Sequence, residues 1–291
     1  MPELLAAFSA FAGAVAAVLA RRILTRTSSA ELLGLNFAVI AVTMLPFAPF
    51  VMQLDVTGRN VWYLAAIIVV DAAANFALFE AIRRSPLAAA LPTLALVPAF
   101  SLLFAFWFFP NDLSGLIVVG AINGIALIAF LQHRSAKTDN PKSNDEPDQP
   151  APQSRTPAVA VALLAAMLFG LTANLSKVLL AETTTNPFGL YWVRAIGIAA
   201  IGLLIARPAR PSQLLQPIFR RGVWVIAQWI SFLAALGAGS IVAVTTLAYM
   251  LPVWGVGLAY FWLAERPKRV EVIAACGAVV NAGFLAWASS R

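Results

Sequence analysis

The chain has 291 residues, of which 61% are hydrophobic and 11% are charged, and its formal net charge is +7. A soluble protein is roughly half apolar and a quarter charged, so this composition excludes an ordinary soluble domain and predicts an all-α polytopic membrane protein. One cysteine and one histidine are too few for an intrachain disulfide or a Cys/His zinc site, and we expect no metal or cofactor. The Lys and Arg residues lie in short clusters between apolar runs, as in membrane loops, so we expect no nucleic-acid partner.

A membrane-spanning helix needs roughly 20 mostly apolar residues, and ten runs of the chain meet this requirement. Their approximate limits are 3–20, 30–51, 61–80, 86–109, 113–131, 157–180, 187–206, 219–237, 240–263 and 270–288. Residues 132–156 are polar and rich in Pro, Asp and Lys, so we interpret them as a flexible linker. The linker separates two five-helix units, residues 1–131 and 157–291.

The two units share weak patterns in the same order, which predicts an internal repeat. Aligning Pro98 with Pro252 pairs LPTLALVPAFSLLFAFWF with AVTTLAYMLPVWGVGLAYFW. An odd number of spans per unit makes the two units insert in opposite orientations. The odd-numbered loops hold 16 of the 20 Lys and Arg residues, linker included. By the positive-inside rule these loops lie inside the cell and both termini outside.

Several stretches of the second unit resemble the EamA type of the drug/metabolite transporter superfamily. FGLTANLSK (169–177) is similar to the aromatic-Gly start and terminal Lys of a repeat's first helix, and NPFGLYWVRAIGIAA (186–200) to its Pro-to-Arg second helix, with Arg194 at the motif position. YMLPVWGVGLAYFWLAERPKRVEVIAACGAVVNAG (249–283) resembles the central Pro, interhelix Glu and Gly-rich last helix. In the first unit the motif's Arg, Lys and Glu are replaced by Asn36, Val18 and Asn111.

The resemblance implies export of small metabolites, since bacterial amino-acid exporters, including those for aromatic amino acids, are the most similar members. It also implies a multi-pass protein of the bacterial inner membrane. Members of the family usually keep both termini in the cytoplasm, which is opposite to the orientation that the loop charges favour.

The third span contains polar residues at its centre. Asp71 and Asn75 are four residues apart and share a helix face, and an intramembrane carboxylate normally faces the bundle interior or a wet cavity. We predict that both face water, with Asp71 binding a substrate amine or carrying a proton; the alternative is a structural hydrogen bond. Glu80 lies near the helix end beside Arg83 and Arg84, which predicts an interfacial ion pair.

Basic residues of the second unit are candidates for binding a carboxylate. Asn174 and Lys177 have helical spacing in the sixth span, and Arg194 lies in the seventh. Lys177 can instead extend to the membrane surface, and Arg194 can instead be a structural tie between helices.

Aromatic residues with a polar group suit the wall of a binding cavity, although most aromatics of a membrane protein belong to interfacial belts or to packing. The predicted cavity wall consists of Trp192, Gln228, Tyr249 and Trp254, while Trp62, Trp107 and Trp262 near span ends are assigned to belts. Pro98 and Pro252 each bend a span, which favours gating at matching positions; a static kink is the simpler alternative.

The hypothesis that best fits these features is a secondary transporter that works by alternating access around a central cavity. Its expected partners are a small-molecule substrate, membrane lipids and protons as coupling ion, and we expect a monomer or a weak homo-oligomer. The alternative is a flippase for a lipid or lipid-linked sugar. An intramembrane enzyme is disfavoured because the only histidine, His133, lies in the linker.

Overall fold

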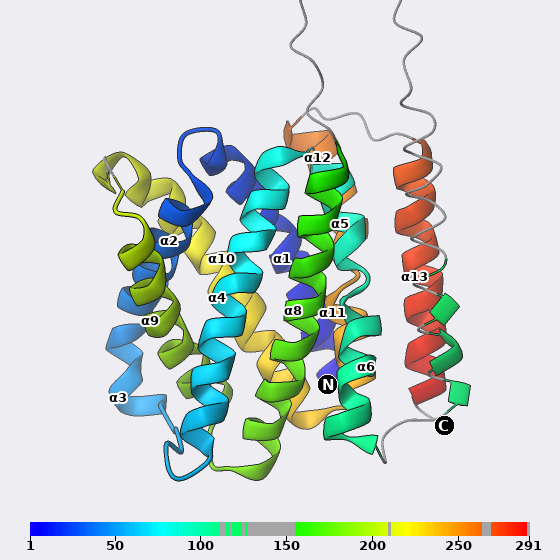
Figure 1. Cartoon of the computed structure of the whole chain (residues 1–291), viewed down its shortest axis with the longest axis horizontal. Coiled ribbons are helices and arrows are strands. Elements are labelled where there is room, and N and C mark those ends of the chain that lie inside the picture. Colours follow the sequence, from blue (N-terminus) through cyan, green and yellow to red (C-terminus); the bar gives the residue numbers. More distant parts are fainter. Residues whose placement is uncertain are drawn as a thin grey trace, which may run out of the picture.

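The computed structural model of the chain describes residues 1–85, 87–110, 155–208, 211–263 and 269–289, and short helical pieces between 115 and 126. Within these residues all regular secondary structure is helical (Figure 1). The predicted linker (132–156) lies almost entirely outside the described residues, and so does more than half of the predicted fifth span (113–131).

The helices follow the apolar runs because a segment in lipid must satisfy its backbone hydrogen bonds internally. Six stretches of the described residues are long and apolar enough to cross a membrane: Pro2–Leu24, Ser29–Val51, Asn60–Arg84, Ala158–Glu182, Pro187–Ile205 and Pro211–Ala238. The helices are α1 (Pro2–Leu24), α2 (Ser29–Met44), η1 (Leu45–Phe47), α3 (Ala48–Val51), α4 (Asn60–Arg84), α5 (Leu87–Leu94), α6 (Val97–Phe108), α8 (Arg155–Glu182), α9 (Pro187–Ile205), α10 (Pro211–Ala238), α11 (Ile241–Ala248), α12 (Leu251–Leu263) and α13 (Arg269–Ser289).

Local sequence sets several helix starts. The Ser28 hydroxyl accepts a hydrogen bond from the Glu31 backbone N–H, and the Glu31 carboxylate accepts one from the Ser28 backbone N–H, which forms a capping box at the start of α2. Asn186 caps α9, and Pro187 occupies the first turn. A backbone N–H has no helical acceptor at this position, so the proline costs no hydrogen bond.

Two predicted spans are interrupted at matching positions. The fourth is divided into α5 and α6 by a turn at residues 95–96, and Pro98 is the second residue of α6. The ninth is divided into α11 and α12 at residues 249–250, and Pro252 is the second residue of α12. A proline cannot donate the backbone hydrogen bond that would continue the preceding helix, so each span breaks just before it.

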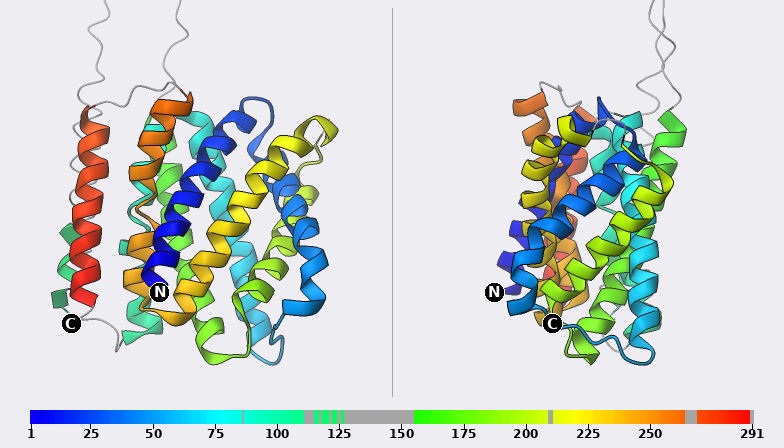
Figure 2. Two further views of the ribbon diagram at one scale, coloured as in Figure 1. Left: turned by 180° about the vertical axis from the view of Figure 1, so that it is seen from behind. Right: turned by 90° about the vertical axis from the view of Figure 1, so that its left-hand side faces the viewer.

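The two halves of the chain interlock through reciprocal helix pairs. α1 packs along α10, α8 packs along α4, and α2 packs along α9. The last pair is very close, because a Cβ atom added to Gly34 would lie 2.8 Å from the Gly202 carbonyl carbon. Small residues of this kind allow membrane helices to meet backbone to backbone. Figure 2 shows that α1 begins and α13 ends toward the same end of the bundle.

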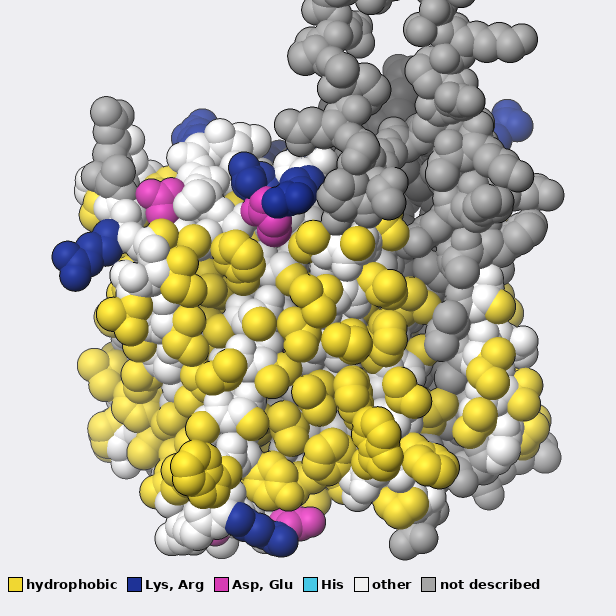
Figure 3. Space-filling model, viewed as in Figure 1, with side chains coloured by type: hydrophobic (Ala, Val, Ile, Leu, Met, Phe, Trp, Pro, Cys, Tyr) yellow, Lys and Arg dark blue, Asp and Glu magenta, His cyan; other side chains and the backbone are white. Residues whose placement is uncertain are grey.

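The surface agrees with a membrane environment. Hydrophobic side chains cover a broad middle band of the face in Figure 3, and charged side chains gather at its two ends. The predicted ion pair of Glu80 is confirmed: its carboxylate lies 2.6 Å from Arg83 Nη2 and 2.7 Å from Arg84 Nε. At the other end of α4, Arg59 and Glu182 form an exposed ion pair at 2.8 Å.

Candidate functional site

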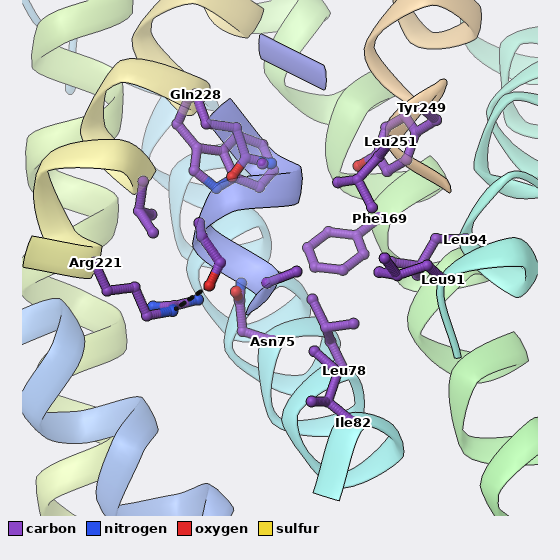
Figure 4. A pocket seen from close by; sticks show the side chains of 15 residues that line it. Asn75, Leu78, Ile82, Leu91, Leu94, Phe169, Arg221, Gln228, Tyr249 and Leu251 are labelled. Atoms are coloured by element: carbon purple, nitrogen blue, oxygen red, sulfur yellow. Dashed lines mark hydrogen bonds between the residues drawn. The ribbon is translucent and has the colours of Figure 1, made fainter. Parts of the chain in front are cut away.

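A small cavity lies at the centre of the bundle, where α1, α4, α8 and α10 approach the breaks in the fourth and ninth spans (Figure 4). Its lining includes Gly13, Asn75, Phe169, Arg221, Gln228 and Tyr249. The cavity has a volume of ≈ 40 Å³. That is room for about three water molecules, whereas pockets that bind small molecules usually measure about 300–1,000 Å³. The cavity must therefore widen before it can enclose a metabolite.

The shape of the cavity depends on a close contact between α1 and α10. A Cβ atom added to Gly13 would lie 2.7 Å from Gln228 Nε2 and 2.8 Å from Leu251 Cδ1. The absence of a side chain at position 13 thus leaves the space that the Gln228 amide occupies at the cavity wall.

The face shared by Asp71 and Asn75 is divided between two environments. Asn75 lines the cavity, and its Nδ2 donates to the Asp71 backbone carbonyl at 2.9 Å. Asp71 is fully buried outside the cavity lining, with Oδ2 3.1 Å from Arg194 Nη2. Its counter-ion is therefore Arg194 of α9, and this pair compensates two charges that would be costly alone in the membrane.

Trp229 of α10 connects the ion pair to the cavity. Its ring lines the cavity and also lies 4.1 Å from the Arg194 guanidinium carbon, and the Tyr191 ring lies 5.3 Å from the same carbon. Tyr191 and Trp229 are stacked at 17°. The Arg194 cation is thus held against two aromatic faces as well as by Asp71, an arrangement that stabilises a desolvated guanidinium.

Arg221 is a second buried cation, and it reaches the cavity directly. Only 5% of the residue is exposed, although it belongs to an arginine pair that sequence analysis counted among the loop charges. Its Nε donates to the Ala16 carbonyl at 3.2 Å, its Nη1 donates to Asn36 Oδ1, and its guanidinium carbon lies 4.9 Å from the Phe79 ring centroid. Among the described residues no carboxylate forms an ion pair with it.

Comparison with known proteins finds a family match for the first part of the chain. Residues 1–132 match the model of the EamA-like transporter family. The family implies a membrane transporter of small molecules, and the resemblance predicted from the sequence is confirmed. The match covers the first unit, whereas the motifs recognised by eye lie mostly in the second.

A solved crystal structure has a similar fold over the whole length of this chain. The two align with a TM-score of 0.66 over 100% of this chain and 96% of the other, at 17% identity. At this identity the likeness shows the fold alone. No curated protein matches the sequence.

Two of the predicted binding residues join helices outside the cavity. Asn174 of α8 donates to the Ser101 carbonyl of α6 at 2.8 Å and to its hydroxyl at 3.1 Å. Lys177 Nζ donates to the backbone carbonyls of Leu236 and Gly239 at 2.8 and 2.6 Å, at the end of α10. Substrate contact by either residue stays a prediction, and neither lines the cavity of this conformation.

The residues of the predicted cavity wall also lie partly inside and partly outside the cavity lining. Tyr249 lines the cavity together with Gln228. Trp192 donates its indole N–H to the Ala41 carbonyl at 3.0 Å, which joins α9 to α2. Trp254 is 47% exposed, and its ring packs edge-on against Phe11 at 5.5 Å. Trp229 and Phe169 supply the other aromatic rings of the cavity.

Arg221 was not predicted as a site residue because it follows another arginine near the start of a span. One signal was available. Arg221 and Gln228 are seven residues apart, so they lie on the same helix face, whereas Arg220 lies about 100° away around the helix. If Gln228 faces the interior, Arg221 must face it too.

Proposed function

We propose that this protein is a secondary transporter that exports small metabolites, with amino acids, aromatic ones included, as the first substrates to test. The observation that carries the proposal is a central cavity lined from both halves of the chain, with polar and aromatic side chains side by side. The amino-acid preference rests on the family resemblance.

Alternating access needs elements that can move beside the binding site. Leu91 and Leu94 of α5 line the cavity next to the first helix break, and Tyr249 and Leu251 line it at the second. A helix break frees backbone groups from the regular hydrogen-bond ladder, so both spans can change their bend there. We propose that movement at Pro98 and Pro252 widens the cavity and exposes it to alternate sides.

The proposal includes two inverted five-helix units in the bacterial inner membrane. The reciprocal packing of α1 on α10 and of α8 on α4 supports it, because exchanging the two units converts one pair into the other. The loop charges favour both termini outside. Protons are the proposed coupling ion, and Asp71 is their proposed carrier, since a proton on its carboxylate would weaken the attraction to Arg194.

The test is efflux of labelled compounds from proteoliposomes that contain the purified full chain. The panel contains aromatic, aliphatic and charged amino acids, with protein-free vesicles as control and a fluorescent phospholipid as flippase probe. The proposal expects efflux of at least one amino acid, accelerated by a proton gradient, and no lipid movement. Lipid movement without efflux of any metabolite would overturn it.

A further inference from the structure

The cavity contains a buried cation whose charge no described carboxylate balances. Arg221 lines the cavity with a 5% exposed side chain. The two buried acids of the described residues form ion pairs with other bases: Asp71 with Arg194 at 3.1 Å, and Glu80 with Arg83 at 2.6 Å. A guanidinium in a membrane interior is costly without an anionic partner. Among the described residues the cavity lining therefore carries a net positive charge, and an anion would be stabilised there.

The geometry points to Arg221 as the anion-binding residue of the transport site. We propose that substrates enter the cavity with a carboxylate directed at Arg221, and that no acidic side chain recognises an amine. The site thereby selects organic anions with an apolar body over organic cations. This inference rests on the proposed function and specifies the substrate class of that site.

The guanidinium has donor capacity left for a ligand. Its Nε and Nη1 donate to Ala16 and Asn36, whereas its Nη2 forms no hydrogen bond with the described residues. The planar fork of a guanidinium matches a carboxylate, and charge-assisted hydrogen bonds of this type are among the strongest in proteins. In Figure 4, Arg221 reaches from α10 toward the centre, where the Asn75 amide also lies.

The rest of the cavity suits the remainder of such a molecule. The side-chain amides of Asn75 and Gln228 can donate to a second oxygen of an anion. Phe169, Trp229 and Tyr249 form an aromatic wall, and ring centroids of Phe169 lie 6.1 Å from Trp229 and 6.5 Å from Tyr249. An aromatic or branched apolar body attached to a carboxylate fits both parts of this lining.

A purely structural role for Arg221 makes a different prediction. Its hydrogen bonds to Ala16 and Asn36 join α10 to α1 and α2. If Arg221 only joined these helices, replacing it would lower the stability of the protein and would weaken the binding of all ligands equally. Anion binding instead predicts a loss that depends on the charge of the ligand. Ligand charge is therefore the variable that separates the two roles.

The experiment measures binding to the purified full chain by calorimetry and uptake into proteoliposomes with three probes of matched shape. These are 3-phenylpropionate, which has only the acid, phenylalanine, which has both groups, and phenethylamine, which has only the amine. The wild type is expected to take the two acids and to discriminate against the amine by about tenfold or more. This comparison needs no variant.

Arg221→Gln is expected to lose about tenfold or more in affinity for both acids, and Arg221→Lys to recover part of it. Arg220→Gln is the matched control, because Arg220 is the exposed neighbour on the same helix. Unchanged acid binding in a folded Arg221→Gln protein, or a wild type that prefers phenethylamine, would overturn this inference while leaving a metabolite transporter. Failure of the wild type to bind or move any metabolite would overturn the proposed function as well.

Discussion

Asp71 of α4 and Arg194 of α9 form an ion pair in which Oδ2 and Nη2 lie 3.1 Å apart and neither side chain is exposed. The acid at the centre of an apolar helix is thus compensated by a base from the other half of the chain. The pair joins the two halves of the chain, and Trp229 both contacts Arg194 and lines the cavity. Replacing either charged residue is therefore expected to affect the cavity.

Replacing one member of this pair leaves a buried charge without its partner. Asp71→Asn is expected to lower the free energy of unfolding by about 3–5 kcal/mol, and a double replacement, Asp71→Leu with Arg194→Met, is expected to recover most of the loss. Thermal denaturation in detergent, followed by size-exclusion chromatography, measures both. The control is Glu182→Gln, which breaks the exposed pair with Arg59 and is expected to cost less than about 1 kcal/mol. Equal stability of Asp71→Asn and the wild type would contradict the assigned role of the pair.

The crossing of α2 and α9 has no room for a methyl group. A Cβ atom on Gly34 would lie 2.8 Å from the Gly202 carbonyl carbon and from the Leu203 nitrogen, so Gly34→Ala must separate two backbones. We expect a loss of about 1–3 kcal/mol, the usual cost of overpacking. Gly257→Ala in α12 is the control, because no atom of the described residues lies within 4 Å of its added Cβ atom. If both variants denature at the same temperature, the close crossing is wrong.

Much of the fold was predictable because lipid leaves few alternatives to helices. The seventh span was expected at 187–206, and α9 covers Pro187–Ile205. Bends at Pro98 and Pro252 were also expected, since proline removes a backbone hydrogen bond, and the structure has helix breaks just before both residues. The start of α10 was missed: it begins at Pro211 and not at 219, because a polar first turn outside the apolar band carries no hydropathy signal.

The partners of the charged residues were harder to predict. Asn75, Gln228 and Tyr249 were chosen from polarity in apolar runs, and all three line the cavity. The pairing of Asp71 with Arg194 depends on how α4 packs against α9, and residue spacing within one helix contains no information about that contact. Which charged residues pair across two helices depends on how both helices are rotated, and residue spacing along the chain does not show that rotation.

The orientation of the chain is tested by a reporter at its end. The excess of Lys and Arg in the odd-numbered loops predicts that both termini lie outside the cytoplasm. A fusion of alkaline phosphatase, active only outside, to Arg291 is expected to be active, and a green fluorescent protein fusion at the same point is expected to be dark. The matched control moves both reporters to a truncation within an odd loop, where the pattern should reverse. Fluorescence at Arg291 would reverse the assignment.

The loop before α4 contains an acid whose protonation should weaken the fold. The hydroxyl and backbone N–H of Thr57 and the amide of Asn60 donate to the Asp55 carboxylate, which holds its pKa below the ordinary value. A carboxyl with a lowered folded-state pKa contributes stability at pH values above its unfolded pKa, about 3.9, and the contribution disappears as the pH falls through the folded value. The denaturation temperature of the wild type should therefore fall more steeply below about pH 4 than that of Asp55→Asn. Parallel pH profiles of the two proteins would contradict this.

Gly13 provides a test of the cavity that leaves all charges in place. In Gly13→Ala the new methyl group meets the end of the Gln228 side chain at 2.7 Å, and this flexible group can move only by entering the cavity or leaving its wall. Transport should therefore fall several-fold while the protein stays folded, because a side-chain end yields more easily than a backbone. Gly237→Ala, on the same helix as Gln228, is the matched control, since its added Cβ atom meets only Leu180 at 4.0 Å. A double variant, Gly13→Ala with Gln228→Ala, removes the clash with Gln228 and leaves only the contact with the flexible end of Leu251 at 2.8 Å, so it should restore cavity volume without restoring the amide. If transport recovers in the double variant, loss of volume explains the defect; if it does not, the Gln228 amide itself contacts the substrate. Unchanged transport in Gly13→Ala would show that the substrate passes elsewhere.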